Sequence, residues 1–258
     1  MALSIIDITT SIQNGTATVR SVVEQAIARA TAVGEYNALL SLTSERALQR
    51  ADEIDTRIAA GESLGRLAGV PFVVKDNFLA FGAPTTAASK MLEHYNAPLQ
   101  ATAVEKLEAE GAICIGKANL DAFAHGTSTE NSVYGVTKNA VDMSRVAGGS
   151  SGGSAVVTAL DVVPFALGTD TGGSIRLPAS FNGVYGIKPT YGTVSRFGVV
   201  AMASSTDCIG CFAGSAEDVA LVLDIMAGQD ERDMTSLPDF FEPQMPGEKK
   251  LRIAVIKD

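Results

Sequence analysis

The segment VAGGSSGGSAVVTALDVVPFALGTDTGGSIRLPAS, residues 146–180, indicates both the fold class and the site of this chain. It contains two blocks rich in glycine and serine, 148–154 and 168–174, separated by an apolar run typical of a helix followed by a strand. Glycine lets backbone N–H groups approach a bound group closely, and serine supplies a hydroxyl that can act as a nucleophile. One such block alone is typical of a flexible turn. Two blocks at the ends of one helix–strand unit favour a catalytic site.

Composition and charge exclude several classes of protein. The chain has 258 residues, of which 46% are apolar, enough to bury the core of a globular domain. Its formal net charge of -9 excludes a basic surface for nucleic acid, so any such role would fall to a partner. We find neither an apolar run of membrane-spanning length nor the features of a secretory signal at the N-terminus. We therefore expect a cytoplasmic protein without membrane contact.

Helices and short apolar strands alternate along the chain. Thr18 is expected to cap the second helix, and Thr43 or Ser44 the third. The predicted helices are 5–15, 18–30, 43–61, 101–110, 154–160 and 216–226, and the predicted strands are 37–42, 70–74, 112–115, 163–167, 184–187 and 251–256. This order indicates an α/β fold with helices on both faces of a sheet.

Common catalytic motifs do not account for the two blocks. The sequence GSSGG at 149–153 fits a nucleophile elbow with Ser151 at its centre, but that fold needs a histidine later in the chain. His94 and His125 are the only histidines, and both come earlier. His125 could instead line a pocket. The chain contains neither the S-x-x-K motif nor a P-loop.

Lys75, at the end of the apolar run 70–74, has two interpretations. Its aliphatic stem can carry the charge to the surface, as most lysines do in this position. Alternatively, burial lowers its pKa so that the neutral amine acts as a base. Because the histidines do not fit a triad, Lys75 is the best proton acceptor available to a serine hydroxyl.

The three cysteines do not form a recognisable site. Cys208 and Cys211 are spaced as C-x-x-C, but neither a second pair nor a histidine pair follows, and Cys114 stands alone. Strand alternation would place Cys208 and Cys211 on opposite faces. We therefore predict three small buried hydrophobic residues and no metal site.

Taken together, three blocks resemble the amidase signature family: GVPFVVKD with Lys75, GGSSGGS at 148–154 and GTDTGGSIRLPAS at 168–180. The resemblance implies the amidase signature fold, a mixed sheet covered by helices on both faces. It also implies a Ser-cisSer-Lys triad, in which Ser174 is the nucleophile, Ser150 bridges from a cis peptide and Lys75 is the base. The implied oxyanion hole consists of the backbone N–H groups of Thr171, Gly172, Gly173 and Ser174.

Three further blocks, 126–139, 187–210 and 229–236, resemble the A subunits of glutamyl-tRNA(Gln)/aspartyl-tRNA(Asn) amidotransferases within that family. This resemblance implies hydrolysis of glutamine and delivery of ammonia to a complex with subunits B and C. ATP and Mg would be used by the partner subunit, which would also bind the aminoacyl-tRNA, and this chain would bind no cofactor. His125 and Ser128 are expected to contact the substrate.

Two alternatives use the same residues differently. A free-standing amidase acting on a small carboxamide or urea derivative would have the same triad, whereas a scaffold would have lost its activity. We expect one domain over 1–258, with a helical region 1–66, a catalytic core 67–228, a linker-like loop 229–250 and the start of a further strand at 251–258. Members of the resembling family are longer, so this domain is expected to lack its C-terminal half and the groups that hold the α-carboxylate and α-amine of glutamine.

Overall fold

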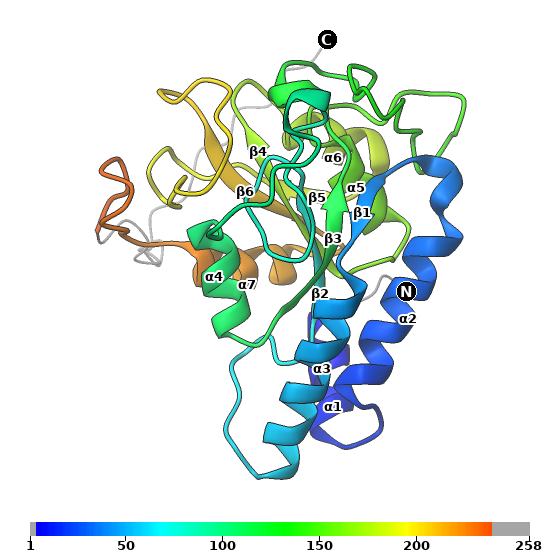
Figure 1. The fold of residues 1–258 in the computed structure, drawn as a ribbon, viewed down its shortest axis with the longest axis vertical. Helices are drawn as coiled ribbons and strands as arrows, with labels where there is room; N and C mark the ends of the chain where they lie inside the picture. Colours follow the sequence, from blue (N-terminus) through cyan, green and yellow to red (C-terminus); the bar gives the residue numbers. More distant parts are fainter. Residues whose placement is uncertain (1–3, 239–258) are drawn as a thin grey trace, which may run out of the picture.

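A six-stranded mixed sheet forms the centre of the structure (Figure 1), with the strand order β1-β3-β2-β4-β6-β5. The computed structural model describes residues 4–238. Strand β2 is parallel to β3 and β4, and the remaining neighbours are antiparallel. The strands are β1 (Leu39–Leu42), β2 (Pro71–Lys75), β3 (Ile113–Ala118), β4 (Phe165–Asp170), β5 (Tyr185–Ile187) and β6 (Cys208–Ala213). Because β2, β3 and β4 are parallel, their carboxyl ends meet at one edge of the sheet.

The helices begin where the sequence supplies caps. The hydroxyl of Thr18 accepts a hydrogen bond from the N–H of Ser21, and Ser21 reciprocates, which confirms Thr18 as the N-cap of the second helix. Thr43 is the N-cap residue of the third helix, but its hydroxyl donates to the carbonyl of Cys114 instead. The helices are α1 (Ile5–Gln13), α2 (Val19–Ala32), α3 (Ser44–Ala59), α4 (Thr102–Ala109), α5 (Gly152–Ala159), α6 (Arg176–Asn182) and α7 (Ala216–Met226), and the short 3-10 helices are η1 (Gly34–Tyr36), η2 (Lys90–Leu92) and η3 (Ala122–Ala124).

Helices cover both faces of the sheet, as predicted. Adjacent residues of a strand point to opposite faces, and β6 shows both environments. Phe212 packs in an apolar cluster with Ala155 of α5 and Ala179 of α6. The thiol of Cys211 instead lies 3.8 Å from the carbonyl oxygen of Val219 in α7. The central strands are therefore shielded from water on either side.

The predicted boundaries shift most at the two glycine blocks. The strand expected at 163–167 runs over Phe165–Asp170, and the helix expected from 154 begins at Gly152. Gly168 pairs with Gly210 of β6, so the second block starts inside the sheet. The strand expected at 112–115 likewise extends to Ala118. These glycines look like turn residues in the sequence, but tertiary packing uses them where backbones approach closely.

The N- and C-terminal parts of the described chain belong to the same unit as the core. Strand β1 pairs with β3, so the region 1–66 contributes to the central sheet. In the predicted linker, the carboxylate of Asp230 accepts hydrogen bonds from Ser195 and Thr102, and that of Asp233 from Arg196. Residues 239–258, including the expected strand at 251–258, lie outside the described residues. Among the residues described, no helix is both long and apolar enough to cross a membrane.

The replacement Gly153→Ala tests the packing at the start of α5. Helix propensity alone predicts stabilisation of about 1 kcal/mol. A Cβ at Gly153 would, however, lie 2.4 Å from the carbonyl oxygen of Ala38 and 2.6 Å from the backbone of Asn119. We therefore expect a loss of about 1–3 kcal/mol, measured by urea unfolding. Gly34→Ala, where nothing lies within 4 Å, is the control. A Gly153→Ala protein as stable as the wild type would contradict this packing.

Candidate active site

Lys75 is completely buried at the carboxyl end of β2, where it contacts two hydroxyl groups. Its Nζ lies 2.7 Å from Oγ of Ser150 and 2.8 Å from Oγ1 of Thr169. Of the two interpretations from the sequence, the buried amine therefore holds. Burial lowers the pKa of Lys75 to about 7, although nearby carboxylates act in the opposite direction. Near neutral pH the amine is available as a base in a substantial fraction of molecules.

The first glycine block brings Ser150 to this lysine. The peptide bond between Gly149 and Ser150 is cis, and the side chain of Ser150 is fully buried. The hydroxyl of Ser151 donates to the carbonyl oxygen of Thr169 at 3.1 Å, and that of Ser154 to the carbonyl oxygen of Leu167 at 2.8 Å. These two serines fasten α5 to β4, so neither has a free hydroxyl. The elbow interpretation centred on Ser151 finds no support in this geometry.

The second block starts within β4 and continues into the loop that places Ser174 next to the first block. The carbonyl oxygen of Ser174 accepts a hydrogen bond from the N–H of Ser151 at 3.2 Å. Ser174 is 7% exposed, and its hydroxyl has no hydrogen-bond partner among the described residues. The structure thus brings the loops of Ser150 and Ser174 together and leaves the Ser174 hydroxyl uncommitted.

Asp170, which the sequence analysis did not single out, shapes the loop before Ser174. Its carboxylate accepts hydrogen bonds from the N–H of Gly173 at 2.8 Å and of Ile175 at 3.1 Å, and it pairs with the guanidinium of Arg176 at 2.9 Å. Burial raises the pKa of Asp170, but these hydrogen bonds outweigh it and hold the pKa below its usual value. The sequence signal was present as GTDTGGSIR, in which Asp170 and Arg176 flank the glycines.

This carboxylate changes the expected set of oxyanion donors. Because the N–H of Gly173 donates to Asp170, it is not free to bind an oxyanion. The N–H groups of Gly172 and Ser174 have no acceptor among the described residues. The side chain of Thr171 donates to Asp207 at 2.6 Å, which ties the loop to the segment before β6. Of the four predicted residues, only Gly173 has its backbone N–H occupied, whereas those of Thr171, Gly172 and Ser174 have no acceptor among residues 4–238.

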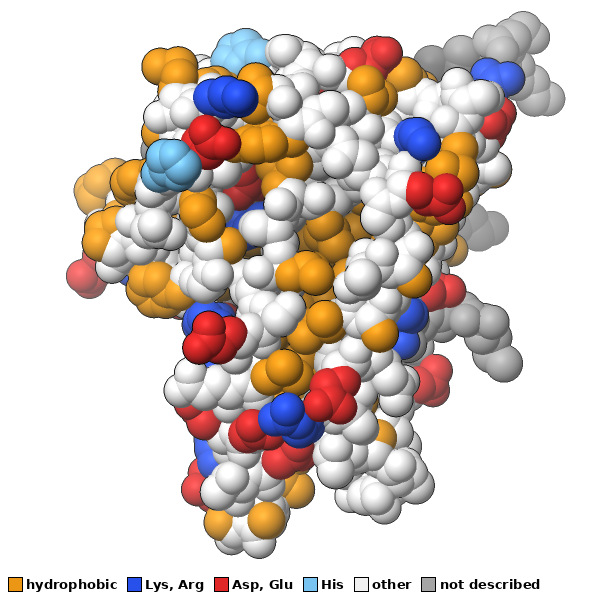
Figure 2. Space-filling view, turned by 45° about the vertical axis from the view of Figure 1, so that its right-hand side comes forward, with side chains coloured by type: hydrophobic (Ala, Val, Ile, Leu, Met, Phe, Trp, Pro, Cys, Tyr) orange, Lys and Arg blue, Asp and Glu red, His pale blue; other side chains and the backbone are white. Residues whose placement is uncertain are grey.

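The two residues expected to bind substrate lie in different environments. The backbone N of Ser128 would be 2.7 Å from a Cβ placed on Gly149, so Ser128 lies directly against the Ser150 loop. His125 is exposed, and its Nδ1 lies 3.0 Å from the carbonyl oxygen of Phe123. Both histidines of the chain, pale blue in Figure 2, are at the surface. The structure brings Ser128 to the site but shows no contact between His125 and Lys75, Ser150 or Ser174.

Comparison with known proteins shows the family of this chain. The family model described as Amidase matches residues 21–258. The chain belongs to the amidase family. Among amidase relatives, the A subunit of the glutamyl-tRNA(Gln) amidotransferase of a Nostoc species is 52% identical over 231 residues, which are 87% of this chain and 48% of that protein. The chain thus spans about half the length of the curated relatives it matches.

Solved structures of different activities share the fold. The peptide amidase from Stenotrophomonas maltophilia has 34% identity and a TM-score of 0.87, over 92% of this chain and 50% of that chain. A vestigial protein complex that bears on the origins of an s-triazine catabolic enzyme has 43% identity and a TM-score of 0.90, over 95% of this chain and 54% of that chain. The amidase fold is therefore common to proteins with different substrates, and the site residues must carry the functional argument.

A buried ion pair between Lys117 and Asp76 supports the loop that follows β2. Nζ of Lys117 lies 2.9 Å from the carboxylate of Asp76, and it donates to the carbonyl of Phe78 and the hydroxyl of Thr85. Asp76 also accepts the N–H of Thr86. Sequence analysis placed Lys117 beyond its strand and missed this pair. Unlike Lys75, this lysine is paired directly with a carboxylate.

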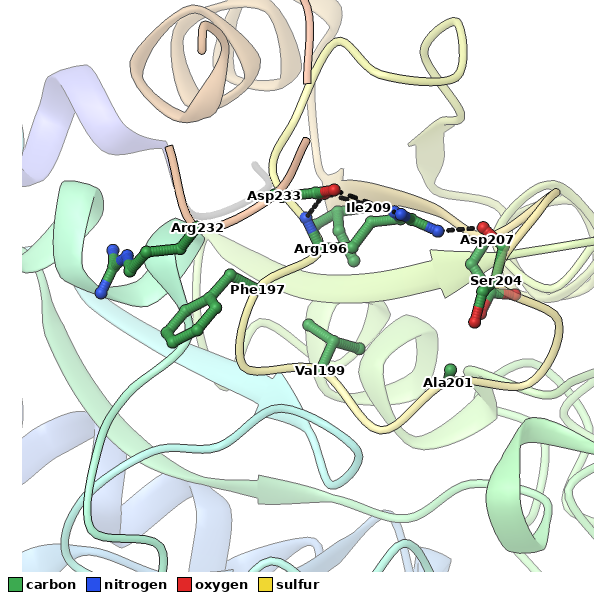
Figure 3. Close-up of a pocket in the computed structure, with 9 residues that line it drawn as sticks. All are labelled: Arg196, Phe197, Val199, Ala201, Ser204, Asp207, Ile209, Arg232 and Asp233. Atoms are coloured by element: carbon green, nitrogen blue, oxygen red, sulfur yellow. Dashed lines mark hydrogen bonds and ion pairs between the residues drawn. The ribbon is translucent and has the colours of Figure 1, made fainter. Parts of the chain in front are cut away.

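A pocket of about 220 Å³ is lined by the segment 196–209 together with Arg232 and Asp233 (Figure 3). Its wall includes Asp207, the residue that accepts the hydroxyl of Thr171. The guanidinium of Arg196 points toward Asp233, which binds it through both carboxylate oxygens. The ion pair between Arg196 and Asp233 thus connects the segment 196–207 to the segment that contains Asp233.

The cysteines are unreactive packing residues. All three are free and buried. Burial raises the pKa of Cys114 to about 11 and also raises that of Cys208 and Cys211, which disfavours the thiolate. Cys208 lies near Lys188 and Cys211 near Val219 of α7, consistent with opposite faces of β6. Within residues 4–238, no cluster of His, Cys, Asp and Glu could hold a metal ion.

The pH dependence of stability tests the buried amine. Between about pH 7 and the ordinary lysine pKa of 10.5, the unfolded chain carries a proton on Lys75 that the folded chain lacks. Raising the pH in this window therefore stabilises the wild type relative to Lys75→Met, by up to about 1.4 kcal/mol per pH unit. Below about pH 7 the difference is constant.

Urea unfolding of the two proteins from pH 6 to 10 measures this difference, and the exposed Lys90→Met is the matched control. A wild-type minus Lys75→Met difference that does not change with pH would show that Lys75 stays charged when folded.

Proposed function

We propose that this chain is the glutamine-hydrolysing A subunit of a tRNA-dependent amidotransferase, acting through a Ser-cisSer-Lys triad. The observation that carries the proposal is the 2.7 Å contact between the buried amine of Lys75 and Oγ of Ser150. A lysine with a lowered pKa in contact with a serine is a base placed for proton transfer. The free hydroxyl of Ser174, on the adjoining loop, supplies the nucleophile.

In the proposed reaction, Oγ of Ser174 attacks the side-chain amide carbon of glutamine. The proton of Ser174 passes to Ser150 while the proton of Ser150 passes to Lys75, so the relay leaves Lys75 charged. Ser150 then protonates the leaving nitrogen, Lys75 restores the proton of Ser150, and ammonia departs. Water attacks the glutamyl ester by the same relay and releases glutamate.

Negative charge on the carbonyl oxygen would be stabilised by the free N–H groups of Thr171, Gly172 and Ser174. Asp170 supports this role indirectly, because it holds Gly173 and Ile175 and thereby sets the curvature of the loop. Ser128, beside Gly149, is placed to contact the substrate, whereas a role for His125 would need a substrate that extends to the surface.

The choice of glutamine and of a complex is supported by the relatives. A protein named as the A subunit of glutamyl-tRNA(Gln) amidotransferase matches 87% of this chain at 52% identity. In the cytoplasmic complex that we propose, ammonia passes to a partner, the B subunit, assembled with the C subunit, and this partner uses ATP and Mg to convert Glu-tRNA(Gln) or Asp-tRNA(Asn) to the amide. The net charge of -9 supports this division, because tRNA binding by this chain itself would be unfavourable.

A free-standing amidase is the second candidate, and the similarity to a peptide amidase supports it. The two functions differ in substrate and in the need for partners. Ammonia release from glutamine that increases when subunits B and C are added supports the amidotransferase. Faster hydrolysis of peptide amides or small carboxamides, unaffected by those subunits, supports the free-standing enzyme. An inactive scaffold is disfavoured because Lys75, Ser150 and Ser174 are all present.

The replacement Ser174→Ala is expected to abolish acylation without unfolding the protein. A serine-directed fluorophosphonate should label the wild type at Ser174, as seen by intact-protein and peptide mass spectrometry. Ser180→Ala, which removes an exposed hydroxyl from the neighbouring α6, should label at the wild-type rate. Labelling of Ser174→Ala at that same rate would assign the nucleophile to another serine.

The replacement Lys75→Ala is expected to reduce the labelling rate, and the release of ammonia from glutamine, by at least ~10²-fold, the contribution of a positioned base. Lys90→Ala, at an exposed site, should have no effect. Activity of Lys75→Ala within a few fold of the wild type would exclude the proton relay.

A further inference from the structure

The neutral amine of Lys75 has two N–H bonds and one lone pair, and the proposed relay works only when the lone pair faces Ser150. Two hydroxyl oxygens lie within hydrogen-bond distance of Nζ, those of Ser150 and Thr169. If Thr169 donated its hydrogen to the amine, the lone pair would be occupied and proton transfer from Ser150 would be blocked. The direction of the Lys75–Thr169 hydrogen bond therefore decides whether Lys75 can accept the proton of Ser150.

Asn77 is the second hydrogen-bond donor to the hydroxyl oxygen of Thr169. It follows β2 by two residues, is 1% exposed and donates through Nδ2 to Oγ1 of Thr169 at 3.3 Å. The same Nδ2 donates to the carbonyl oxygen of Val200 at 3.3 Å. A carbonyl can only accept, so Val200 fixes which end of the amide faces Thr169. The flipped amide would place two acceptors against each other.

The backbone holds Asn77 in this position. The N–H of Val200 donates to the carbonyl of Asn77 at 2.8 Å, and Phe78 forms a β-bridge with Val199. Val199 lies on the loop that lines the pocket in Figure 3. Oδ1 of Asn77 is buried and receives no hydrogen bond from the described residues. A side chain selected for packing alone would avoid such an unsatisfied acceptor.

We propose that Asn77 is a positioning residue for the base: its amide N–H occupies one lone pair of the Thr169 oxygen and orients that hydroxyl so that its second lone pair takes one hydrogen of the Lys75 amine, which leaves the lone pair of the amine facing Ser150. The inference rests on the proposed function and adds a direction to its proton relay. Asn77 acts through Thr169 and touches neither substrate nor nucleophile.

Because several carboxylates already face Lys75, the charge of the side chain at position 77 affects the pKa of the amine. Three carboxylates raise the pKa of Lys75: those of Asp121, Asp170 and Asp207. Asp121 follows β3, Asp170 ends β4 and Asp207 precedes β6. The neighbouring Asp76 is paired with Lys117. A further carboxylate at position 77 would favour the ammonium form and remove the base at neutral pH.

The test measures the rate of fluorophosphonate labelling of Ser174 from pH 5 to 10, with Ser174→Ala as the blank. This readout separates the pH midpoint, which reports the pKa of the base, from the plateau rate, which reports its orientation. A change in folded fraction alone lowers the plateau without moving the midpoint. Circular dichroism of each variant establishes that it is folded.

We expect Asn77→Asp to raise the midpoint by about 1–3 pH units, as for an opposite charge within hydrogen-bonding reach. Asn77→Leu and Thr169→Val should keep a midpoint near or below that of the wild type and lower the plateau at least ~10-fold, part of the contribution of a positioned base. Thr169→Ser, which restores the hydroxyl, should return the plateau to within about threefold of the wild type.

Two matched controls should match the wild type in midpoint and plateau. Asn96→Asp makes the same change of charge at an exposed asparagine, and Thr9→Val removes a buried hydroxyl from α1. Wild-type midpoints and plateaus in Asn77→Asp and Asn77→Leu would overturn the inference while leaving the triad intact. If Asn77→Asp does not fold, a plateau of Thr169→Val equal to that of Thr169→Ser would overturn it. Failure of the wild type to label above the Ser174→Ala blank would instead refute the proposed function.

Discussion

The removal of Lys75 from water is the constraint on which the site depends. In solution its amine would be protonated at neutral pH, and a protonated amine is not a base. The central strand β2, paired on both sides and covered by helices, leaves Lys75 without solvent contact. Three carboxylates in the neighbourhood favour the ammonium form, yet burial outweighs them and the pKa falls to about 7. The position of the lysine in the sheet, rather than any one partner, thus lowers its pKa.

The same burial requires polar partners for the amine, which the ends of the neighbouring elements provide. Ser150 comes from the loop before α5 and Thr169 from the carboxyl end of β4. Glycines make this convergence possible, because a side chain on Gly149 would collide with Asp121 and with the backbone of Ser128. The serines of the first block make different contacts. Ser150 faces the amine, whereas Ser151 and Ser154 donate to carbonyl oxygens of β4.

The carboxylates near the site hold loops rather than substrate. Asp121 accepts the N–H groups of Thr129 and Asn131, and Asp170 accepts those of Gly173 and Ile175. Such charge-assisted hydrogen bonds order loops that glycine would otherwise leave flexible. An amidase site of this kind is compatible with several amide substrates, which agrees with the different activities of the similar solved structures. In the mechanism that we propose, substrate choice then depends on residues that surround the relay.

Much of the fold and part of the site could be predicted from the sequence. Local patterns determined the α/β class, the cap at Thr18 and the bounds of α7, because caps and apolar spacing act within a few residues. The glycine blocks and Lys75 were recognisable as candidates, but the sequence alone allowed either a surface or a buried lysine. Tertiary structure decided between them. It also revealed Asn77, Thr169 and Asp170, began α5 inside a glycine block and turned His125 to the surface. Lys75 and Thr169 are 94 residues apart, and contacts over such separations depend on which strands become neighbours in the sheet, which no local pattern specifies.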